Sequence, residues 1–296
     1  FDDTASDRYV NHLLASVSTP LTGLKIVIDC ANGASSVVGP LAYEKAGATV
    51  IAIHHTPDGW NINENCGSTH LEDLQARVVK EGADFGIAHD GDADRCLAID
   101  ATGDEIDGDV IMAILAKGFK AQGKLKANTI VGTVMSNLGF MHAMAESGIE
   151  VVTTAVGDRY VLEAMLQSDF NLGGEQSGHV IMRDHANTGD GLLTALQLLA
   201  EVKRSGQTLQ ELSRVMVRFP QVLINVKNVA KERLASSTAI ADAVKAAETE
   251  LGSNGRVLLR ASGTEPLVRV MVEAQSDAVA QDVATKLAQI VETELK

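Results

Sequence analysis

The chain has 296 residues, of which 45% are hydrophobic, and a formal net charge of -14. This length and apolar content suffice for two or three domains with buried cores. The acidic charge argues against general binding to nucleic acid or anionic lipid, and the absence of a long apolar run and of a secretory signal pattern leads us to expect a cytoplasmic protein with no membrane partner.

The start of the chain is unusual for a complete protein. The first residue is Phe rather than Met, and residues 7–14 (DRYVNHLL) predict a helix that is entered from something upstream. We therefore expect a processed or truncated product.

A strand–helix–strand pattern occurs twice in the first two thirds of the chain. The strands are short apolar runs bounded by turn residues, which predicts parallel βαβ units. The predicted elements are, in order, a strand over 24–30, a helix ending at Gly47, a strand over 48–53, a strand over 128–135, a helix over 137–148 capped by Ser136 or Asn137, and a strand over 150–156. In both units a further strand leads into a polar loop, where ligands usually bind in such sheets.

The last 80 or so residues follow a different pattern, in which strands are separated by short loops rather than by crossover helices. The predicted elements are strands over 222–229, 256–259 and 268–274, a helix over 237–251 closed by Gly252, and a final helix from Asp277 towards Lys296. This order is typical of an α+β domain with an antiparallel sheet.

The predicted fold is therefore α/β, with two related mixed-sheet domains followed by a smaller α+β domain that contains an antiparallel sheet. We expect the domains to cover residues 1–118, 119–215 and 216–296.

An acidic loop follows the apolar strand that ends near residue 88. Three like charges, Asp90, Asp92 and Asp94, repel one another by roughly 4 kcal/mol per pair at about 4 Å and an effective dielectric of about 20, so we expect a cation. Their oxygens suit Mg²⁺ or Ca²⁺, and an EF-hand is a poor fit because Arg95 and Ala101 stand where Gly and Glu are needed. Mg²⁺ that also binds a phosphate fits better, with Arg95 holding phosphoryl oxygens. The alternative is a solvated acidic turn in which Arg95 pairs with a neighbouring Asp.

A glycine-rich loop, residues 173–179 (GGEQSGH), is the counterpart of the acidic loop in the second unit. Its glycines let the backbone approach a ligand, while Glu175 and Ser177 suit the hydroxyls of a sugar. A tight turn with ordinary surface residues is the alternative. We expect His179 to be structural.

A third loop, within 260–269 (RASGTEPLVR), connects two strands of the last domain. Guanidinium, hydroxyl and backbone N–H groups in this arrangement predict a phosphate site, formed by Arg260, Ser262, Gly263, Thr264 and Arg269. The alternative is a surface hairpin turn with Arg–Glu pairing.

The remaining polar residues give weaker indications. Arg159, just after a strand, is positioned to meet an anion, although a helix start capped by Asp158 explains the stretch nearly as well. The histidines show no metal-ligand spacing with carboxylates, and we expect His54, His55, His70 and His89 to be structural. The three cysteines, Cys30, Cys66 and Cys96, are widely separated, which suggests neither a disulfide framework nor a zinc site nor a nucleophile.

Taken in order, these loops resemble the motifs of the α-D-phosphohexomutases. The metal loop of that family is similar to residues 90–95 (DGDADR), its sugar loop to 174–179 (GEQSGH) and its phosphate loop to 260–266 (RASGTEP). Further stretches, GTVMSNLG, VGDRYVLE, NINENCGSTH and NTGDG, resemble the branch that acts on glucosamine phosphates. The resemblance covers nearly the whole chain.

The resemblance implies four domains, of which this chain contains the second, third and fourth. The family's first domain carries a phosphorylated serine in a Ser-His-Asn-Pro setting, and these 296 residues contain no Ser-His dipeptide. We therefore expect the isolated chain to be inactive. A smaller departure is Ala93, where the family commonly has Gly, which matters only if that position needs a positive φ.

The implied reaction of the complete enzyme interconverts glucosamine 6-phosphate and glucosamine 1-phosphate through a phosphoserine and a bisphosphate intermediate. By the same resemblance Mg²⁺ binds to Asp90, Asp92 and Asp94 with Arg95 beside it, Glu175 and Ser177 hold sugar hydroxyls, and the loop around Arg260 holds the phosphate that is not transferred. The implied partners are a phosphosugar substrate and, as an open alternative, a second copy of the chain in a homodimer.

Three rivals remain. The first is a mutase of the same family acting on glucose or mannose phosphates, which Gln176 and its surroundings disfavour. The second is a phosphatase with an aspartate nucleophile, which the D-x-D of Asp90 and Asp92 suggests. That class has its first strand near the start of the chain and a Thr or Val shortly after the second Asp, and neither feature is found here. The third is a non-catalytic module that binds phosphosugars.

Overall fold

The computed structural model describes residues 4–263 and 265–296. The chain divides into two compact units. The larger unit combines Phe1–Ser136 with Phe140–Met216, and the smaller combines Asn137–Gly139 with Val217–Lys296. Gly118 lies inside a helix, and the domain boundary expected between residues 118 and 119 stays a prediction.

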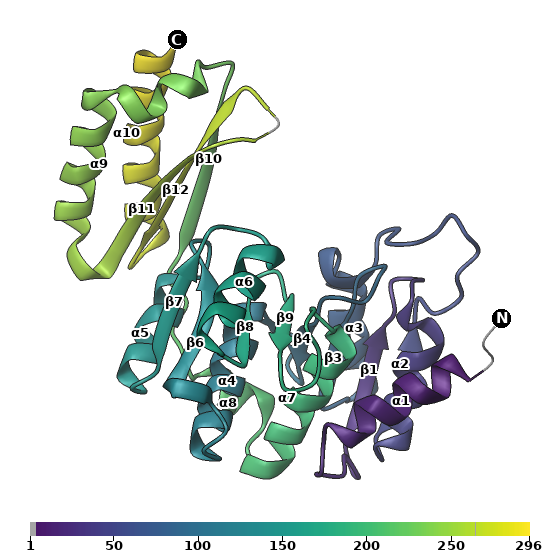
Figure 1. Cartoon of the computed structure of the whole chain (residues 1–296). Coiled ribbons are helices and arrows are strands. Elements are labelled where there is room, and N and C mark those ends of the chain that lie inside the picture. The colour runs from purple at the N-terminus through teal and green to yellow at the C-terminus, as the bar shows by residue number, and fades with distance from the viewer. Residues whose placement is uncertain (1–3, 264) are drawn as a thin grey trace. The chain divides into compact units, whose positions relative to one another are not determined.

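The first sheet of the larger unit has the strand order β2-β1-β3-β4-β5, and Figure 1 labels β1, β3 and β4 of this sheet. Strands β2, β1 and β3 are parallel, whereas β4 and β5 are antiparallel to their neighbours. The strands are β1 (Lys25–Asp29), β2 (Thr49–Ile53), β3 (Phe85–Ala88), β4 (Leu97–Asp100) and β5 (Glu105–Ile106), and the helices are α1 (Ala5–Ala15), α2 (Ser35–Lys45) and α3 (Glu72–Glu81). The predicted helix over 7–14 and the predicted strands over 24–30 and 48–53 are confirmed within one or two residues at most ends.

The alternation of side chains along β1 explains why helices cover both faces of this sheet. Ile26 and Ile28 belong to the cluster that contains Tyr43 of α2, whereas Val27 belongs to a separate cluster with Leu74 of α3. Successive residues of a strand point to opposite faces. A strand that is apolar at every position therefore needs a helix layer on each side.

The second sheet repeats this arrangement with the order β7-β6-β8-β9. Strands β7, β6 and β8 are parallel and β9 is antiparallel, as in the first sheet. The elements are β6 (Thr129–Thr133), α5 (Leu138–Glu146), β7 (Glu150–Thr154), α6 (Asp158–Ser168), β8 (Leu172–Gly174) and β9 (Val180–Met182). The predicted repeat of two related mixed sheets is therefore confirmed.

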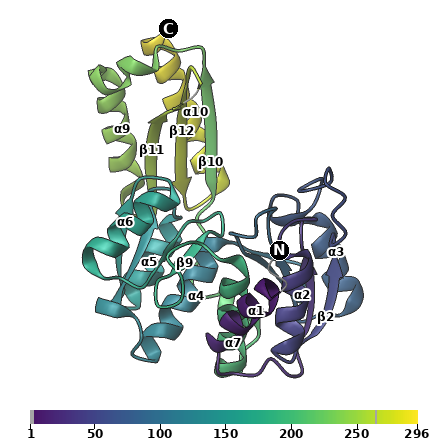
Figure 2. The same ribbon diagram turned by 45° about the vertical axis from the view of Figure 1, so that its right-hand side comes forward.

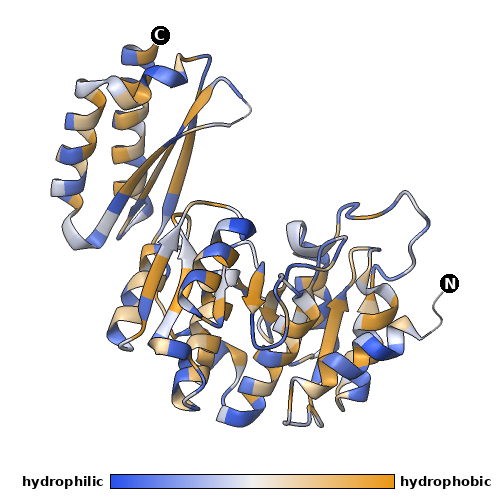
Figure 3. Ribbon diagram, viewed as in Figure 1, coloured by the Kyte–Doolittle hydropathy of each residue, from blue (hydrophilic) through white to orange (hydrophobic). Residues whose placement is uncertain are grey.

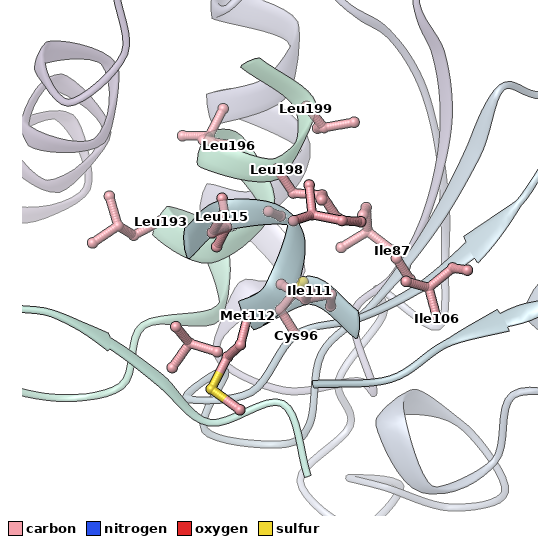
Figure 4. Close-up of a cluster of buried hydrophobic side chains, with 14 of the residues drawn as sticks. Ile87, Cys96, Ile106, Ile111, Met112, Leu115, Leu193, Leu196, Leu198 and Leu199 are labelled. Atoms are coloured by element: carbon pink, nitrogen blue, oxygen red, sulfur yellow. The ribbon is translucent and has the colours of Figure 1, made fainter. Parts of the chain in front are cut away.

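The two sheets share one core through helices that the sequence analysis did not single out. Helices α4 (Gly108–Ala121) and α7 (Gly191–Ser205) pack against each other, and α8 (Leu209–Ser213) packs against α4. Figure 4 shows side chains of α4 and α7 in one buried cluster, among them Leu115 and Leu196. Burying a leucine of this kind is worth about 1.5–3 kcal/mol, so this contact joins the two repeats into a single unit.

The smaller unit is an antiparallel sheet of order β10-β12-β11, as predicted (Figure 2). Alternate residues of β12, such as Val268, Val270 and Val272, pack in a cluster with Val283 and Leu287 of the last helix. In Figure 3 hydrophobic residues run along these strands while the helices carry hydrophilic residues as well. The elements are β10 (Gln221–Lys227), α9 (Thr238–Leu251), β11 (Gly255–Ala261), β12 (Leu267–Ala274) and α10 (Asp277–Leu295).

The short segment Asn137–Gly139 belongs to the smaller unit because of a buried carboxylate. Glu273 of β12 is fully buried and forms an ion pair with Arg256, with 2.7 Å between Oε2 and Nε. It also accepts hydrogen bonds from Asn137 Nδ2 at 3.2 Å and from the backbone N–H of Leu138 at 2.9 Å. Asn137 Oδ1 in turn accepts from Gly139 N–H, as expected for a helix cap.

Four short 3₁₀ helices complete the described chain, namely η1 (Gly67–Thr69), η2 (Lys126–Asn128), η3 (Lys231–Ser236) and η4 (Gly252–Asn254). Within residues 4–263 and 265–296, none of the helices combines the length and the apolar character that crossing a membrane requires. The three cysteines are free and buried.

Candidate functional site

The acidic loop, residues 89–96, connects β3 to the antiparallel strand β4. Carboxylate oxygens of Asp90, Asp92 and Asp94 lie within 4.8 Å of one another. Asp90 is largely buried and Asp92 is exposed. The loop is held against the start of α2 by a hydrogen bond from Ala34 N–H to the carbonyl of Gly91, at 2.8 Å. The structure therefore brings the three predicted metal ligands together at the carboxyl end of β3.

The charges in this loop are only partly balanced. Arg95 Nε lies 3.4 Å from Asp90 Oδ2 and 3.7 Å from Asp94 Oδ1. Burial raises the pKa of the Asp94 carboxyl above its usual value, and Asp90 and Asp92 raise it further, while His179 and Arg95 oppose the rise. Asp94 Oδ1 is buried and has no hydrogen-bond partner among the described residues. Mg²⁺ prefers hard oxygen ligands such as these carboxylates, and an ion would offset the repulsion among them.

The buried ring of His89 supports the backbone of the acidic loop. It is fully buried, and its Nδ1 lies 2.8 Å from the carbonyl oxygen of Arg95 while its Nε2 lies 2.9 Å from the hydroxyl of Tyr43. Because a carbonyl only accepts, Nδ1 carries the proton and Nε2 accepts from Tyr43. Burial lowers the pKa of His89, which keeps this tautomer neutral. The expected structural role of His89 agrees with this arrangement.

Ala93 adopts the left-handed conformation, with φ +61°. The departure from Gly at this position therefore has a physical consequence, since a residue with a Cβ atom is strained there by about 1 kcal/mol. The carbonyl of Ala93 accepts a hydrogen bond from Gly191 N–H at the start of α7, which holds the turn in place.

The glycine-rich loop joins β8 to β9 and lies directly beside the acidic loop. Arg95 and His179 form an isolated antiparallel bridge, and Cys96 N–H donates to the carbonyl of Gly178 at 3.0 Å. Gly178 has φ +91°, and a Cβ atom there would lie 2.4 Å from the carbonyl oxygen of Cys96. Only glycine allows this close approach of the two loops.

His179 contributes to both loops, which the sequence analysis missed. Its ring is buried, and Nε2 lies 3.6 Å from Asp94 Oδ2. The ring also fills the space beside Gly189, where a Cβ atom would meet Nε2 at 2.3 Å. No local sequence pattern signals this contact, because His179 and Asp94 come together through the bridge between Arg95 and His179, which are remote in the chain.

The polar residues of the glycine-rich loop are held by neighbouring helix starts. Glu175 Oε1 accepts a hydrogen bond from Gly157 N–H, the cap of α6, at 2.8 Å. The carbonyl of Gln176 accepts from Gly108 N–H at the start of α4, at 3.0 Å. Ser177 is exposed at the tip. One oxygen of Glu175 is thus fixed by the start of α6, and Ser177 is accessible to solvent.

A small cleft opens beside the acidic loop. It has a volume of about 210 Å³. Tyr9 and Asp190, which the sequence analysis did not select, contribute to its wall, and the Tyr9 hydroxyl donates to Asp190 Oδ1 at 2.8 Å. Burial, followed by the nearby Asp190 carboxylate, raises the pKa of Tyr9. The lining residues are Tyr9, Ala34, Val38, Asp92, Ala93, Asp94, Gly189, Asp190 and Leu192.

Arg159 lies in the first turn of α6 and is largely exposed. Its Nε lies 2.8 Å from Oε1 of Glu163, one helical turn further on. The cap of α6 is Gly157, so the alternative of a cap by Asp158 is wrong. The predicted contact of Arg159 with an anion stays a prediction.

In the smaller unit, Arg260 and Arg269 lie directly opposite each other on β11 and β12. On the other side of β12, Asn225 is the register partner of Arg269. Like charges in such a cross-strand pair are destabilising. An anion between the two guanidinium groups would remove this cost, which is the physical case for a phosphate site here.

The loop after β11 is shaped by Lys231, another residue that the sequence analysis missed. Its Nζ donates to the carbonyls of Ser262 at 2.5 Å and Glu265 at 2.9 Å. The Ser262 hydroxyl accepts from Glu265 N–H at 3.2 Å, and Gly263 is exposed. Thr264, the remaining predicted ligand, lies outside the described residues.

Comparison with known proteins identifies the family. Three models of the phosphoglucomutase/phosphomannomutase family match the chain in consecutive order: alpha/beta/alpha domain II over residues 7–103, alpha/beta/alpha domain III over 107–219 and the C-terminal domain over 223–290. The chain belongs to the phosphoglucomutase/phosphomannomutase family. The family's domain II contains the acidic loop, domain III the glycine-rich loop and the C-terminal domain the Arg260 loop.

Curated relatives within this family share high identity. The chain is 60% identical over 289 residues to phosphoglucosamine mutase of Streptomyces griseus, covering 98% of this chain and 64% of the relative. It is 59% identical to phosphoglucosamine mutase of Thermobifida fusca, covering 99% of this chain and 66% of the relative. The chain thus spans slightly less than two thirds of the length of these relatives.

Solved structures support the family fold. A phosphoglucomutase/phosphomannomutase family protein of Burkholderia thailandensis superimposes with a TM-score of 0.80 at 22% identity, covering 97% of this chain and 64% of that one. N-acetylphosphoglucosamine mutase of Aspergillus fumigatus, solved in complex with GlcNAc-6P and magnesium, gives a TM-score of 0.80 at 21% identity, covering 99% of this chain and 67% of that one.

Proposed function

We propose that this chain supplies the metal, sugar and phosphate sites of a phosphoglucosamine mutase, the cytoplasmic enzyme that interconverts glucosamine 6-phosphate and glucosamine 1-phosphate. The single observation that carries the proposal is the bridge between Arg95 and His179, which holds a cluster of three carboxylates beside a loop suited to sugar hydroxyls. The identity of 57–60% to relatives with that name supports the choice of substrate.

Asp90, Asp92 and Asp94 are the residues that would hold Mg²⁺. The buried Oδ1 of Asp94, which has no hydrogen-bond partner among the described residues, and the raised pKa of that carboxyl fit such an ion. When bound, Mg²⁺ supplies charge neutralisation for a phosphoryl group. His89 and Gly191 keep the loop in the required shape, since each contacts its backbone.

The chain's other polar groups would bind and orient the phosphosugar. Arg95 lies beside the carboxylates and offers its guanidinium to phosphoryl oxygens, a role that suits a planar fork. Glu175 and Ser177 would hold sugar hydroxyls in either orientation of the bisphosphate intermediate. Arg260, Ser262, Gly263, Thr264 and Arg269 would hold a phosphate group of the substrate. Phosphoryl transfer depends mainly on such positioning and charge stabilisation.

As a polypeptide on its own, the chain would act as a phosphosugar-binding fragment without turnover. Two observations favour this second candidate. The chain covers 64% of the length of the Streptomyces griseus relative, and its sequence contains no Ser-His dipeptide. A phosphoserine donor would then come from the segment that the relatives have in addition.

Turnover measurements test the proposal. The purified chain is assayed with Mg²⁺ and glucosamine 6-phosphate, glucose 6-phosphate or mannose 6-phosphate, alone and fused behind the N-terminal third of the Thermobifida fusca relative. We expect binding without turnover by the chain alone and preferential turnover of glucosamine 6-phosphate by the fusion. Turnover by the pure chain would show that it contains a nucleophile, and a fusion that prefers mannose or glucose phosphate would contradict the substrate.

A further inference from the structure

A second cluster of metal-ligand side chains lies in the larger unit, outside the acidic loop. One ligand atom from each of Asp29, His54 and Cys66 lies within 4.8 Å of the other two. Asp29 follows the apolar run of β1, His54 directly follows β2, and Cys66 precedes η1. Asp29 and Cys66 are fully buried, whereas the His54 side chain is one quarter exposed, which provides a route from solvent. We propose that these three side chains bind a zinc-type divalent transition-metal ion.

The chemistry of the three donors selects such an ion over Mg²⁺. A carboxylate, an imidazole and a thiolate are the ligand types of zinc sites, and a sulfur ligand disfavours hard cations. Tetrahedral coordination places O, N and S ligand atoms about 3.3–3.6 Å apart. His54 Nδ1 lies 2.9 Å from Asp29 Oδ2, so these two atoms would move slightly apart for an ion to replace the proton between them. Water from the exposed side would be the fourth ligand.

Each donor also has the supporting contact that metal ligands usually have. The other ring nitrogen of His54, Nε2, lies 3.1 Å from Oδ2 of Asp73 on α3, which forms a carboxylate–histidine pair of the kind that orients zinc-bound imidazoles. Asp29 accepts the backbone N–H groups of Ala31 and Gly67, both at 2.9 Å. Cys66 Sγ accepts from the side-chain amide of Asn32 at 3.8 Å, which favours negative charge on sulfur.

The competing explanation is a metal-free cluster in which the two ring nitrogens of His54 link Asp29 to Asp73. Burial, and then Asp29 and Glu64, raise the pKa of the Cys66 thiol, so this cysteine is protonated in the metal-free protein. An ion would therefore have to displace a proton from the sulfur as well as from His54. The bound ion would fasten the loop over residues 54–66 to the end of β1.

Cobalt spectroscopy of the purified chain distinguishes these explanations. Co²⁺ is titrated into the metal-free protein in excess Mg²⁺, which occupies hard oxygen sites. We expect a near-ultraviolet thiolate-to-cobalt charge-transfer band that saturates at one equivalent and is abolished by one equivalent of Zn²⁺. A carboxylate loop gives no such band because it has no sulfur. A wild-type chain that shows no band would overturn the proposal.

Three variants locate the site. Cys66→Ser is expected to abolish the band, while Cys96→Ala, which removes another buried cysteine, should retain it. Asp73→Asn changes an exposed residue that positions His54, and should keep the band but weaken Zn²⁺ binding about 10- to 100-fold. A band that persists in Cys66→Ser, or Zn²⁺ affinity equal in Asp73→Asn and wild type, would refute the assignment. Circular dichroism verifies that each variant is folded.

Discussion

Arg95 and His179 face each other in an antiparallel bridge, although they are 84 positions apart in sequence (179 minus 95). This bridge and the adjacent hydrogen bond from Cys96 to Gly178 fix the acidic loop against the glycine-rich loop. Both loops belong to the same compact unit. Disturbing the contact between them should therefore affect metal binding and sugar binding together.

Gly178→Ala tests this coupling. The new Cβ atom would lie 2.4 Å from the carbonyl oxygen of Cys96 and would push the loops apart. We expect a loss of stability of about 2–5 kcal/mol, which combines left-handed strain of about 1–2 kcal/mol with overpacking of about 1–3 kcal/mol. We also expect weaker binding of both Mg²⁺ and glucosamine 6-phosphate. Denaturant unfolding and calorimetry measure the two effects.

Gly23→Ala is the matched control for Gly178→Ala. Gly23 has nearly the same φ, +88°, but apart from its chain neighbours no atom of the described residues lies within 4 Å of the added Cβ. Only the left-handed strain of about 1–2 kcal/mol should remain, and ligand binding should be unchanged. Equal losses in the two variants would show that the close approach at Gly178 is unimportant.

Asp94→Asn should weaken Mg²⁺ binding at least about tenfold, because it removes one of three anionic ligands. The same change should stabilise the metal-free protein at neutral pH. Since the pKa of Asp94 is raised in the folded state, the native protein binds more protons than the unfolded chain, and stability falls as pH rises from the ordinary carboxyl pKa through the raised value.

Thermal unfolding of wild type and Asp94→Asn between acidic and neutral pH, without metal, measures this effect. The variant should lack the part of the pH dependence that Asp94 contributes and should be the more stable protein at the neutral end. A variant that is less stable than wild type at neutral pH without Mg²⁺ would contradict the repulsion that we assign to the acidic loop.

Ala93→Gly should stabilise the protein by about 1 kcal/mol, because glycine adopts φ +61° without a Cβ penalty. Ala127→Gly, at φ +54° and outside the acidic loop, provides the comparison and should stabilise to a similar extent. Urea denaturation gives both values. If Ala93→Gly is destabilising, the left-handed turn in the acidic loop is incorrect.

Arg260→Ala should weaken binding of glucosamine 6-phosphate by about 1.5–3 kcal/mol, the scale of a hydrogen bond to a charged group. Without ligand it should stabilise the smaller unit by about 0.2–1 kcal/mol, because it removes a like-charge pair with Arg269. Arg233→Ala removes the same charge from an exposed position in η3 and should change neither quantity. Calorimetry that finds equal losses of affinity in both variants would indicate general charge attraction rather than a phosphate site.

The local elements of this protein follow from the sequence by itself. Ser237 and Gly252 were expected to begin and close a helix, and they are the caps of α9, because a side-chain oxygen satisfies a free N–H group and a glycine accepts the conformation that ends a helix. The apolar runs became buried strands, and the alternate aspartates of the acidic loop came together because they are only two residues apart. Such features depend on neighbours in the chain.

Tertiary structure alone decided which distant residues meet. Tyr9 contacts Asp190, and His179 reaches Asp94, through packing of whole elements that no local pattern encodes. The wide spacing of the cysteines suggested no metal site, yet the ends of β1 and β2 bring Cys66 to Asp29 and His54. The reason is physical: propensities and caps act over a few residues, whereas parallel pairing and the burial of α4 against α7 place loops side by side from remote parts of the chain.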